Sequence, residues 1–239
     1  MNILSIGNSF SQDAQRYLHR IAATDGFELN TFNLFIGGCP LSRHYRNMLS
    51  DECAYTLEMN GQSTGFNVSL KGALLNRDWD IITIQQASPK SNCYDTYQPY
   101  LNKVVEFVKA CVPKAKIAVH QTWAYEQGSE RLQELGYSNH IDMFNNIKDA
   151  YENAAKDIDA DILIPSGLLL QKLISEGIDK VHRDTFHLSC GVGRYAVGLL
   201  WYTILTGNSI IGNNFCDFDE EISDDYIKIA KKCVDDLAK

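Results

Sequence analysis

The sequence predicts an α/β protein, a three-layer α/β/α sandwich built around a five-stranded parallel sheet. Short apolar runs bounded by turn residues alternate five times with stretches whose apolar residues have helical spacing. This alternation is typical of a parallel sheet with helices on both faces. The chain has 239 residues, of which 45% are hydrophobic. Because that length can form a core without disulfides or metal, we expect residues 1–239 to form a single domain.

The predicted sheet begins with a strand–turn–helix unit. The apolar run at residues 3–6 leads into Gly7-Asn8-Ser9-Phe10-Ser11, and helical spacing follows from residue 14 to residue 22. A serine at this junction lies at the carboxyl end of a strand and near the positive end of a helix, where an anionic transition state is favoured. Ser9 is therefore a candidate nucleophile. The alternative is that Ser9 or Ser11 only caps the helix.

The other predicted strands cover residues 29–36, 81–84, 116–119 and 161–165, with a small antiparallel hairpin excursion at about 53–68. Helices are predicted between and after them, at about residues 69–76, 101–112, 143–154, 168–174, 193–202 and 222–237. The second strand ends in Gly37-Gly38-Cys39-Pro40, a turn that can expose N–H groups. The alternative is an ordinary strand-to-loop turn.

Polar side chains also follow the third and fourth of these strands. Gln85 and Gln86 come after the third strand and His120 after the fourth. Ligands bind beyond the carboxyl ends of parallel strands, so we expect these side chains to share one rim with Ser9 and Gly38.

Asp184 and His187 lie three residues apart in a predicted loop near the carboxyl end of the chain. In this arrangement the carboxylate can accept the imidazole Nδ1–H, which leaves Nε2 facing outward as a base. The alternative is a helix-capping aspartate beside a solvated histidine. His182, Asp184 and His187 could also converge on a metal, but no other cluster of metal ligands supports that interpretation, and we expect no metal and no cofactor.

Charge and cysteine content exclude several classes of function. The formal net charge is −8, with 22 basic and 30 acidic residues, and the basic residues are scattered, so neither nucleic acid nor an anionic membrane is an expected partner. No apolar run approaches the roughly 20 residues that span a bilayer. The seven cysteines form no Cys-x-x-Cys pair, which indicates a reducing compartment. We expect a cytoplasmic protein, or an exported one if a leader was trimmed from the chain.

The order of these motifs resembles the successive sequence blocks of the SGNH (GDSL-like) hydrolases, in particular a poorly characterised bacterial branch. The blocks are Gly-Asn-Ser9-Phe-Ser, Asn33-x-x-x-Gly37-Gly38, a polar amide after the third strand, and Asp184-x-x-His187. The resemblance implies a flavodoxin-like fold, Ser9 as nucleophile, His187 as general base and Asp184 as the group that orients it. It also implies an oxyanion hole formed by the backbone N–H groups of Ser9 and Gly38 and by a side-chain amide.

The third donor is where the sequence departs from the family pattern. The usual Gly-x-Asn-Asp block is absent, and Gln85-Gln86-Ala87-Ser88 stands in its place. We predict Gln86 as the amide donor, with Gln85 as the second choice.

The resemblance implies a serine hydrolase that cleaves a carboxylic ester, and we expect a short acyl group such as acetyl on a carbohydrate. Polar and aromatic residues after the strands favour a sugar over a lipid: Tyr94, Tyr97, His120, Trp123 and Tyr125. Gln85, His44, His120 and Trp123 are candidate substrate contacts, although His44 and His120 are equally compatible with bonding loop carbonyls. The oligomeric state stays open.

Three other functions remain compatible with the pattern. One is a lipase or thioesterase type of acyl hydrolase, and another is a non-catalytic glycan-binding module on the same scaffold. The third is a phosphate or nucleotide binder that uses Gly7-Asn8-Ser9 as an anion cradle. This third alternative is disfavoured because the chain has neither Gly-x-x-x-x-Gly-Lys nor Gly-x-Gly-x-x-Gly.

Overall fold

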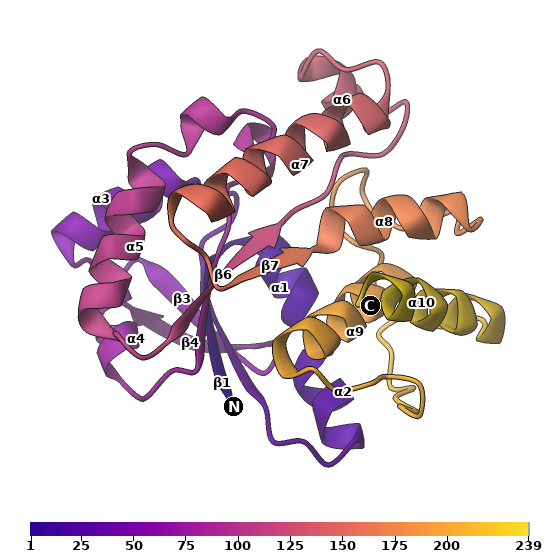
Figure 1. Cartoon of the computed structure of the whole chain (residues 1–239), viewed down its shortest axis with the longest axis horizontal. Coiled ribbons are helices and arrows are strands. Elements are labelled where there is room, and N and C mark those ends of the chain that lie inside the picture. Colours follow the sequence, from indigo (N-terminus) through magenta and orange to yellow (C-terminus); the bar gives the residue numbers. More distant parts are fainter. Residues whose placement is uncertain (239) are drawn as a thin grey trace.

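The computed structural model describes residues 1–238, and its centre is a seven-stranded sheet in the order β4-β3-β2-β1-β5-β6-β7 (Figure 1). The five parallel strands are β1 (Asn2–Gly7), β2 (Asn30–Phe35), β5 (Ile81–Ile84), β6 (Lys116–Gln121) and β7 (Ile162–Pro165). They confirm the predicted parallel α/β sheet and lie where the apolar runs placed them.

The predicted total of five strands is wrong, because the hairpin extends the sheet instead of leaving it. Strands β3 (Tyr55–Met59) and β4 (Gln62–Val68) pair antiparallel, and β3 also pairs antiparallel with β2. The register places Leu34 opposite Leu57. The alternating pattern of the hairpin is visible in the sequence, but its pairing with a strand some 25 residues earlier depends on the tertiary fold.

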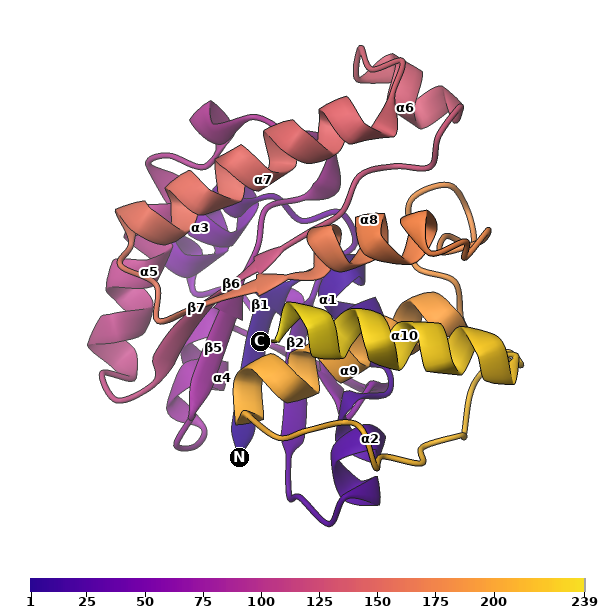
Figure 2. The ribbon, with the colours of Figure 1, turned by 45° about the vertical axis from the view of Figure 1, so that its right-hand side comes forward.

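Helices cover both faces of the sheet (Figures 1 and 2). One layer contains α3 (Leu41–Ser50), α4 (Leu70–Leu75), α5 (Tyr100–Cys111) and α7 (His140–Asp157), and the short helix α6 (Glu130–Glu134) precedes α7. The other layer contains α1 (Ser9–Gln15), α2 (Leu18–Thr24), α8 (Ser166–Ser175), α9 (Val192–Thr206) and α10 (Asp224–Leu237). Two 3₁₀ turns, Ser88–Lys90 and Tyr94–Thr96, follow β5.

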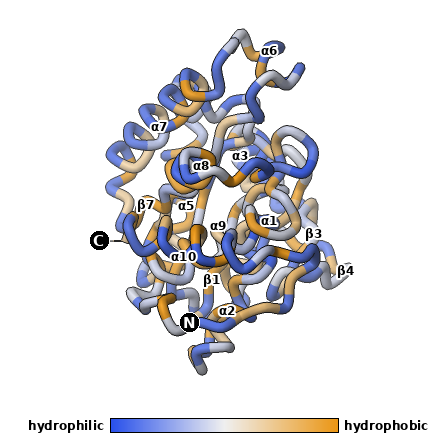
Figure 3. The backbone as a smooth tube through the Cα atoms, turned by 90° about the vertical axis from the view of Figure 1, so that its right-hand side faces the viewer, coloured by the Kyte–Doolittle hydropathy of each residue, from blue (hydrophilic) through white to orange (hydrophobic). Residues whose placement is uncertain are grey.

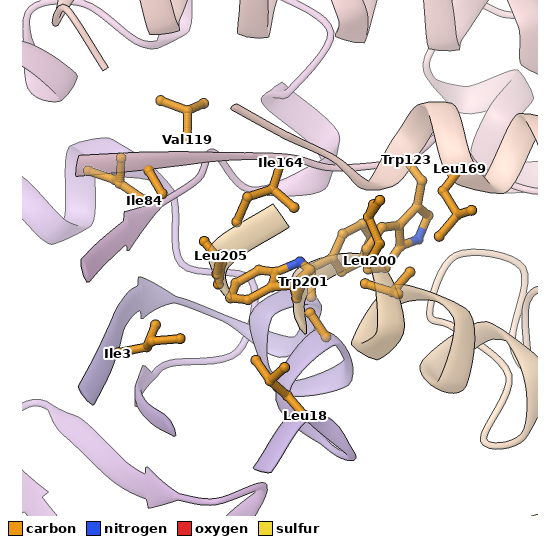
Figure 4. Close-up of a cluster of buried hydrophobic side chains, with 14 of the residues drawn as sticks. Ile3, Leu18, Ile84, Val119, Trp123, Ile164, Leu169, Leu200, Trp201 and Leu205 are labelled. Atoms are coloured by element: carbon orange, nitrogen blue, oxygen red, sulfur yellow. The ribbon is translucent and has the colours of Figure 1, made fainter. Parts of the chain in front are cut away.

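The core lies between the sheet and these helices. Ile3, Ile84 and Ile164 from the strands lie in one cluster with Leu200 and Trp201 from α9 (Figure 4). Helix α9 is buried on nearly all sides because it lies between the sheet and α10, whereas hydrophilic and hydrophobic residues alternate along the outer helix α7 (Figure 3). Among the described residues, no helix combines the length and apolar character needed to cross a membrane.

The strand register brings the predicted polar residues to one edge. Ile6 lies beside Ile84, and Ile84 beside Val119. Because the five strands are parallel, the residues that follow β1, β2, β5 and β6 therefore meet at the same rim.

Candidate active site

Ser9 is the first residue of α1, but it does not cap the helix. Asn8 is the N-cap: its Oδ1 accepts the Phe10 N–H at 2.9 Å, and its own N–H donates to Ser11 Oγ at 3.0 Å. Asn8 and Ser11 thus take the capping role that the sequence left open, and the Ser9 hydroxyl is free to bond elsewhere. The Ser9 N–H, in the first turn of the helix, has no partner within the helix.

The turn before Ser9 requires a glycine and is supported from beneath by a buried polar cluster. A Cβ at Gly7 would lie 2.0 Å from Ser11 Oγ. Ser11 Oγ lies 2.8 Å from Asn33 Oδ1, and Asn33 Nδ2 donates to Glu58 Oε2 at 2.8 Å. Gln12 donates to the other oxygen of Glu58. Burial raises the pKa of the Glu58 carboxyl despite these two hydrogen bonds.

The Ser9 hydroxyl meets an imidazole that comes 178 residues later in the chain. Ser9 Oγ lies 2.8 Å from His187 Nε2, and His187 Nδ1 lies 2.8 Å from Asp184 Oδ2. The other oxygen of Asp184 accepts the His187 backbone N–H at 2.9 Å. Burial raises the pKa of Asp184, but the hydrogen bonds from the His187 side chain and backbone outweigh it and lower the pKa overall. The ionised carboxylate therefore accepts Nδ1–H, and the Nε2 lone pair faces Ser9.

The turn after β2 lies against the nucleophile turn. Asn8 Nδ2 donates to the Cys39 carbonyl at 3.3 Å, and the Cys39 N–H closes the turn on the Ile36 carbonyl at 3.2 Å. Gly38 has a φ of +60°, in the left-handed region that favours glycine, and it is exposed. The structure thus brings the predicted glycine turn next to Asn8 and Ser9, at the solvent-facing rim.

Gln86 does not have the free amide that an oxyanion donor needs, and that prediction is wrong. Its Nε2 donates to the carbonyl and hydroxyl oxygens of Thr96 at 3.0 and 3.2 Å, which uses both amide hydrogens. Its Oε1 accepts the Leu41 and Ala87 N–H groups at 3.0 and 2.9 Å. Gln86 therefore links the start of α3 to the 3₁₀ turn at Thr96.

Gln85, the second choice, points toward the nucleophile turn. Its Nε2 donates to Asn8 Oδ1 at 2.8 Å, and its Oε1 lies 2.6 Å from His120 Nδ1. One N–H of the Gln85 amide remains for another acceptor. His120 in turn holds the Gln85 amide in place. Burial lowers the pKa of His120 to about 3, so the imidazole is neutral, and His120 Nε2 lies 3.1 Å from Ser166 Oγ.

His44, His120 and Trp123 are fully buried, so none of them is the substrate contact that the sequence suggested. His44 lies 3.1 Å from the Tyr55 hydroxyl through Nδ1, and burial lowers its pKa to about 3. Trp123 stacks on Phe10, with ring centroids 4.2 Å apart. Tyr97 and Tyr125 are buried as well. The predicted aromatic rim for a sugar is therefore wrong, because most of these rings pack inside the protein.

Sequence reasoning missed two groups that support the site. Asn8 caps α1 and binds Gln85, a role that its place in the Gly-Asn-Ser block could have signalled. Asp13 is fully buried between Arg183 and Arg194, and no local signal indicated this pairing across about 170 residues. Within the described part of the chain, no group of three or more His, Cys, Asp or Glu is arranged to hold a metal ion. His182 Nε2 instead lies 3.1 Å from the Ala124 carbonyl.

Comparison with known proteins places the chain in a family. Residues 2–236 match the family described as a domain of unknown function, DUF4886. The chain belongs to this family. A DUF4886 protein from Bacteroides uniformis ATCC 8492 has a crystal structure that superposes with a TM-score of 0.91 at 32% identity, over 99% of this chain and 94% of that one. No curated protein matches the sequence of this DUF4886 member.

More distant solved structures share the fold. A candidate SGNH hydrolase from Slackia heliotrinireducens has a TM-score of 0.64 at 24% identity, covering 86% of this chain and 98% of that one. The psychrotrophic esterase EstA from Pseudoalteromonas sp., in a structure inhibited by monoethylphosphonate, has a TM-score of 0.55 at 12% identity, over 86% and 97% of the two chains. This DUF4886 member therefore has the SGNH-hydrolase fold, as the order of its motifs predicted.

Proposed function

We propose that this chain is a serine esterase that hydrolyses carboxylic esters through an acyl-enzyme on Ser9. The observation that carries the proposal is the hydrogen-bonded series of Ser9, His187 and Asp184 at the carboxyl rim of an SGNH-type sheet. A serine hydroxyl is a weak nucleophile at neutral pH, and the His187 imidazole 2.8 Å away can take its proton as the bond to the acyl carbon forms.

Ser9, His187, Asp184 and one water molecule are sufficient for the complete reaction. Ser9 Oγ bonds to the carbonyl carbon while its proton moves to His187 Nε2, and Asp184 stabilises the resulting imidazolium. His187 then returns the proton to the alcohol oxygen as the ester C–O bond breaks. A water molecule attacks the acyl-serine by the same proton transfers, which releases the carboxylic acid and restores Ser9.

The oxyanion of each tetrahedral intermediate needs hydrogen-bond donors directed at the former carbonyl oxygen. We assign this role to the N–H groups of Ser9 and Gly38 and to the remaining amide N–H of Gln85. The orientation of the Gln85 amide supports this assignment. The Trp201 indole N–H donates to Ser166 Oγ at 3.3 Å, and the Ser166 hydroxyl can donate to His120 Nε2, which leaves the Nδ1–H of His120 for the Gln85 oxygen. In this arrangement the Gln85 nitrogen faces Asn8, the residue before Ser9.

For the substrate we propose a short acyl group, such as acetyl, on a polar alcohol such as a carbohydrate. Since most of the predicted aromatic residues are buried, the support for this substrate comes from the exposed residues at the rim. Gly37, Gly38 and Asp184 are exposed, and this surface of backbone groups and a carboxylate suits a hydrated alcohol better than the acyl chain of a lipid.

The decisive experiment compares wild type with Ser9→Ala on p-nitrophenyl acetate, butyrate and octanoate and on acetylated sugars. We expect Ser9→Ala to lower kcat by about a thousandfold or more, and we expect activity to fall with acyl length. A fluorophosphonate should modify Ser9 and not the neighbouring Ser11, as mapped by peptide mass spectrometry. Equal rates for the two proteins, or labelling that survives Ser9→Ala, would contradict the proposal.

A further inference from the structure

One buried carboxylate joins the helix that carries Ser9 to the loop that carries Asp184 and His187. Asp13 lies in α1, four residues after Ser9, and is fully buried. Its Oδ2 accepts the Leu188 backbone N–H at 3.0 Å, and its two oxygens lie 2.9 and 3.1 Å from one guanidinium nitrogen of Arg183. Arg183 directly precedes Asp184, and Leu188 directly follows His187, so Asp13 contacts both ends of the segment that holds the two residues.

Hydrogen bonds join the two ends of the loop at residues 183–188. Contacts at these ends therefore affect the conformation of the whole loop. The Arg183 N–H donates to the His187 carbonyl at 3.0 Å, and the Arg183 side chain donates to the Leu188 carbonyl at 2.5 Å. At its tip, the Thr185 carbonyl accepts the Glu126 N–H at 2.7 Å, and Thr185 has a φ of +73°. The side of the loop that faces α1 is held by Asp13.

We propose that Asp13 is a positioning residue that sets the distance between Ser9 and His187, an inference that rests on the proposed esterase function. Ser9 and Asp13 are one helical turn apart and lie on the same side of α1. A single rigid turn therefore presents the nucleophile to His187 and the anchor to the residues that flank His187. The bonds to Asp13 are charge-assisted and buried, and such bonds are short and directional.

A different role for Asp13 is to neutralise buried charge in the fold. Arg194 Nε also bonds Asp13 Oδ1 at 2.9 Å, and Arg194 continues to Asp219 at 2.9 Å. Asp219 in turn pairs with Arg16. Asp219 thus belongs to the same charge network and shares Arg194 with Asp13, but its bonds to these two arginines do not involve the loop at residues 183–188. This makes Asp219 the matched control.

The test compares Asp13→Asn with Asp219→Asn in steady-state kinetics on p-nitrophenyl acetate. Asp13 does not touch the substrate, so Asp13→Asn should lower kcat by about 10- to 100-fold and leave KM within about twofold, since a displacement near 1 Å can cost about 100-fold in rate. Asp219→Asn should keep kcat within about twofold. An unchanged kcat in Asp13→Asn, or an equal loss in the two variants, overturns the proposal.

Hydrogen exchange tests the same coupling without relying on activity. In Asp13→Asn, a peptide covering residues 183–188 should exchange at least tenfold faster than in wild type, whereas peptides from β1 and α9 should keep their rates, and Asp219→Asn should leave the loop peptide unchanged. If wild type hydrolyses no ester, the proposed function fails while this exchange experiment still decides the role of Asp13. Should Asp13→Asn not fold, Arg183→Gln removes the guanidinium bonds and leaves the Leu188 bond, and it is judged by the same two measurements.

Discussion

Lowering the pH from 7 to 5 should remove much of the stability of this protein, because three buried histidines are neutral in the folded state. Burial lowers the pKa of His44 and His120 to about 3, and it lowers the pKa of His182 to about 4, although a hydrogen bond to the Ala124 carbonyl partly opposes the shift. Each of the three residues is at most 4% exposed.

The loss of stability at low pH follows from the number of protons that each state binds. Below pH 6.5 the unfolded chain binds a proton at each of these histidines, while the folded protein does not until its lower pKa is reached. At pH 5 the solution is about 1.5 pH units below the unfolded-state pKa of each ring, and one unit corresponds to about 1.36 kcal/mol. Each histidine therefore removes about 2 kcal/mol between pH 7 and pH 5, and the three together remove about 6 kcal/mol. Domains have total stabilities of only about 5–15 kcal/mol.

The variant His120→Asn isolates one of these contributions. Its amide can still donate to Gln85, but it does not titrate in this range. Urea unfolding at pH 7, 6 and 5 should show that the variant loses about 2 kcal/mol less than wild type between pH 7 and pH 5, whatever its stability at pH 7. Ile164→Val, in the same core (Figure 4), lowers stability by about 0.5–1.5 kcal/mol without removing a titratable group, and it should keep the wild-type pH dependence. If His120→Asn and wild type lose equal free energy, the reasoning is refuted.

Four further variants test the site. Gln85→Ala should lower kcat by about 100- to 1,000-fold through loss of an oxyanion donor. Gln86→Ala should keep kcat but lower the free energy of unfolding, measured in urea, by about 1–3 kcal/mol. The reverse pattern would show that Gln86 is the oxyanion donor. Burial raises the pKa of Glu58 in the folded state, so the stability that this carboxyl contributes is present below about pH 4.5 and is lost as the pH rises through the raised pKa. The Tm of Glu58→Gln relative to wild type should therefore be higher at pH 7 than at pH 4.5, and a Tm difference that does not change with pH would contradict this. Gly7→Ala should cost about 1–3 kcal/mol from overpacking against Ser11, and an unchanged urea midpoint would show that the turn can relax.

The strands and several site residues could be predicted because their signals are local. Apolar runs near residues 3, 32, 82, 117 and 163 each form a strand, and the Gly-Asn-Ser turn and the Asp-x-x-His spacing are visible within a few residues. Parallel strands end at a common rim, so the order of the motifs also predicted which residues would be neighbours.

The errors concern burial and partners, which no local window contains. His120 lies within β6, which extends past the predicted end of that strand, and Trp123 follows the strand as a rim residue does. Trp201 covers His120 and Phe10 covers Trp123, both from other parts of the chain. Gln86 and Gln85 are adjacent and chemically identical, and only their distant partners, Thr96 and Asn8, give them different orientations.

The sequence by itself determined the α/β layers, the nucleophile turn and the short Asp184–His187 unit, because each depends on residues close together in the chain. Only the tertiary structure decided that Ser9 meets His187, that β3 and β4 extend the sheet, and that Asp13 holds the loop at residues 183–188. These contacts join segments that lie from about 25 to 178 residues apart. Whether such segments meet depends on the packing of the whole chain, since a buried charge or amide is stable only where its partners are brought to it.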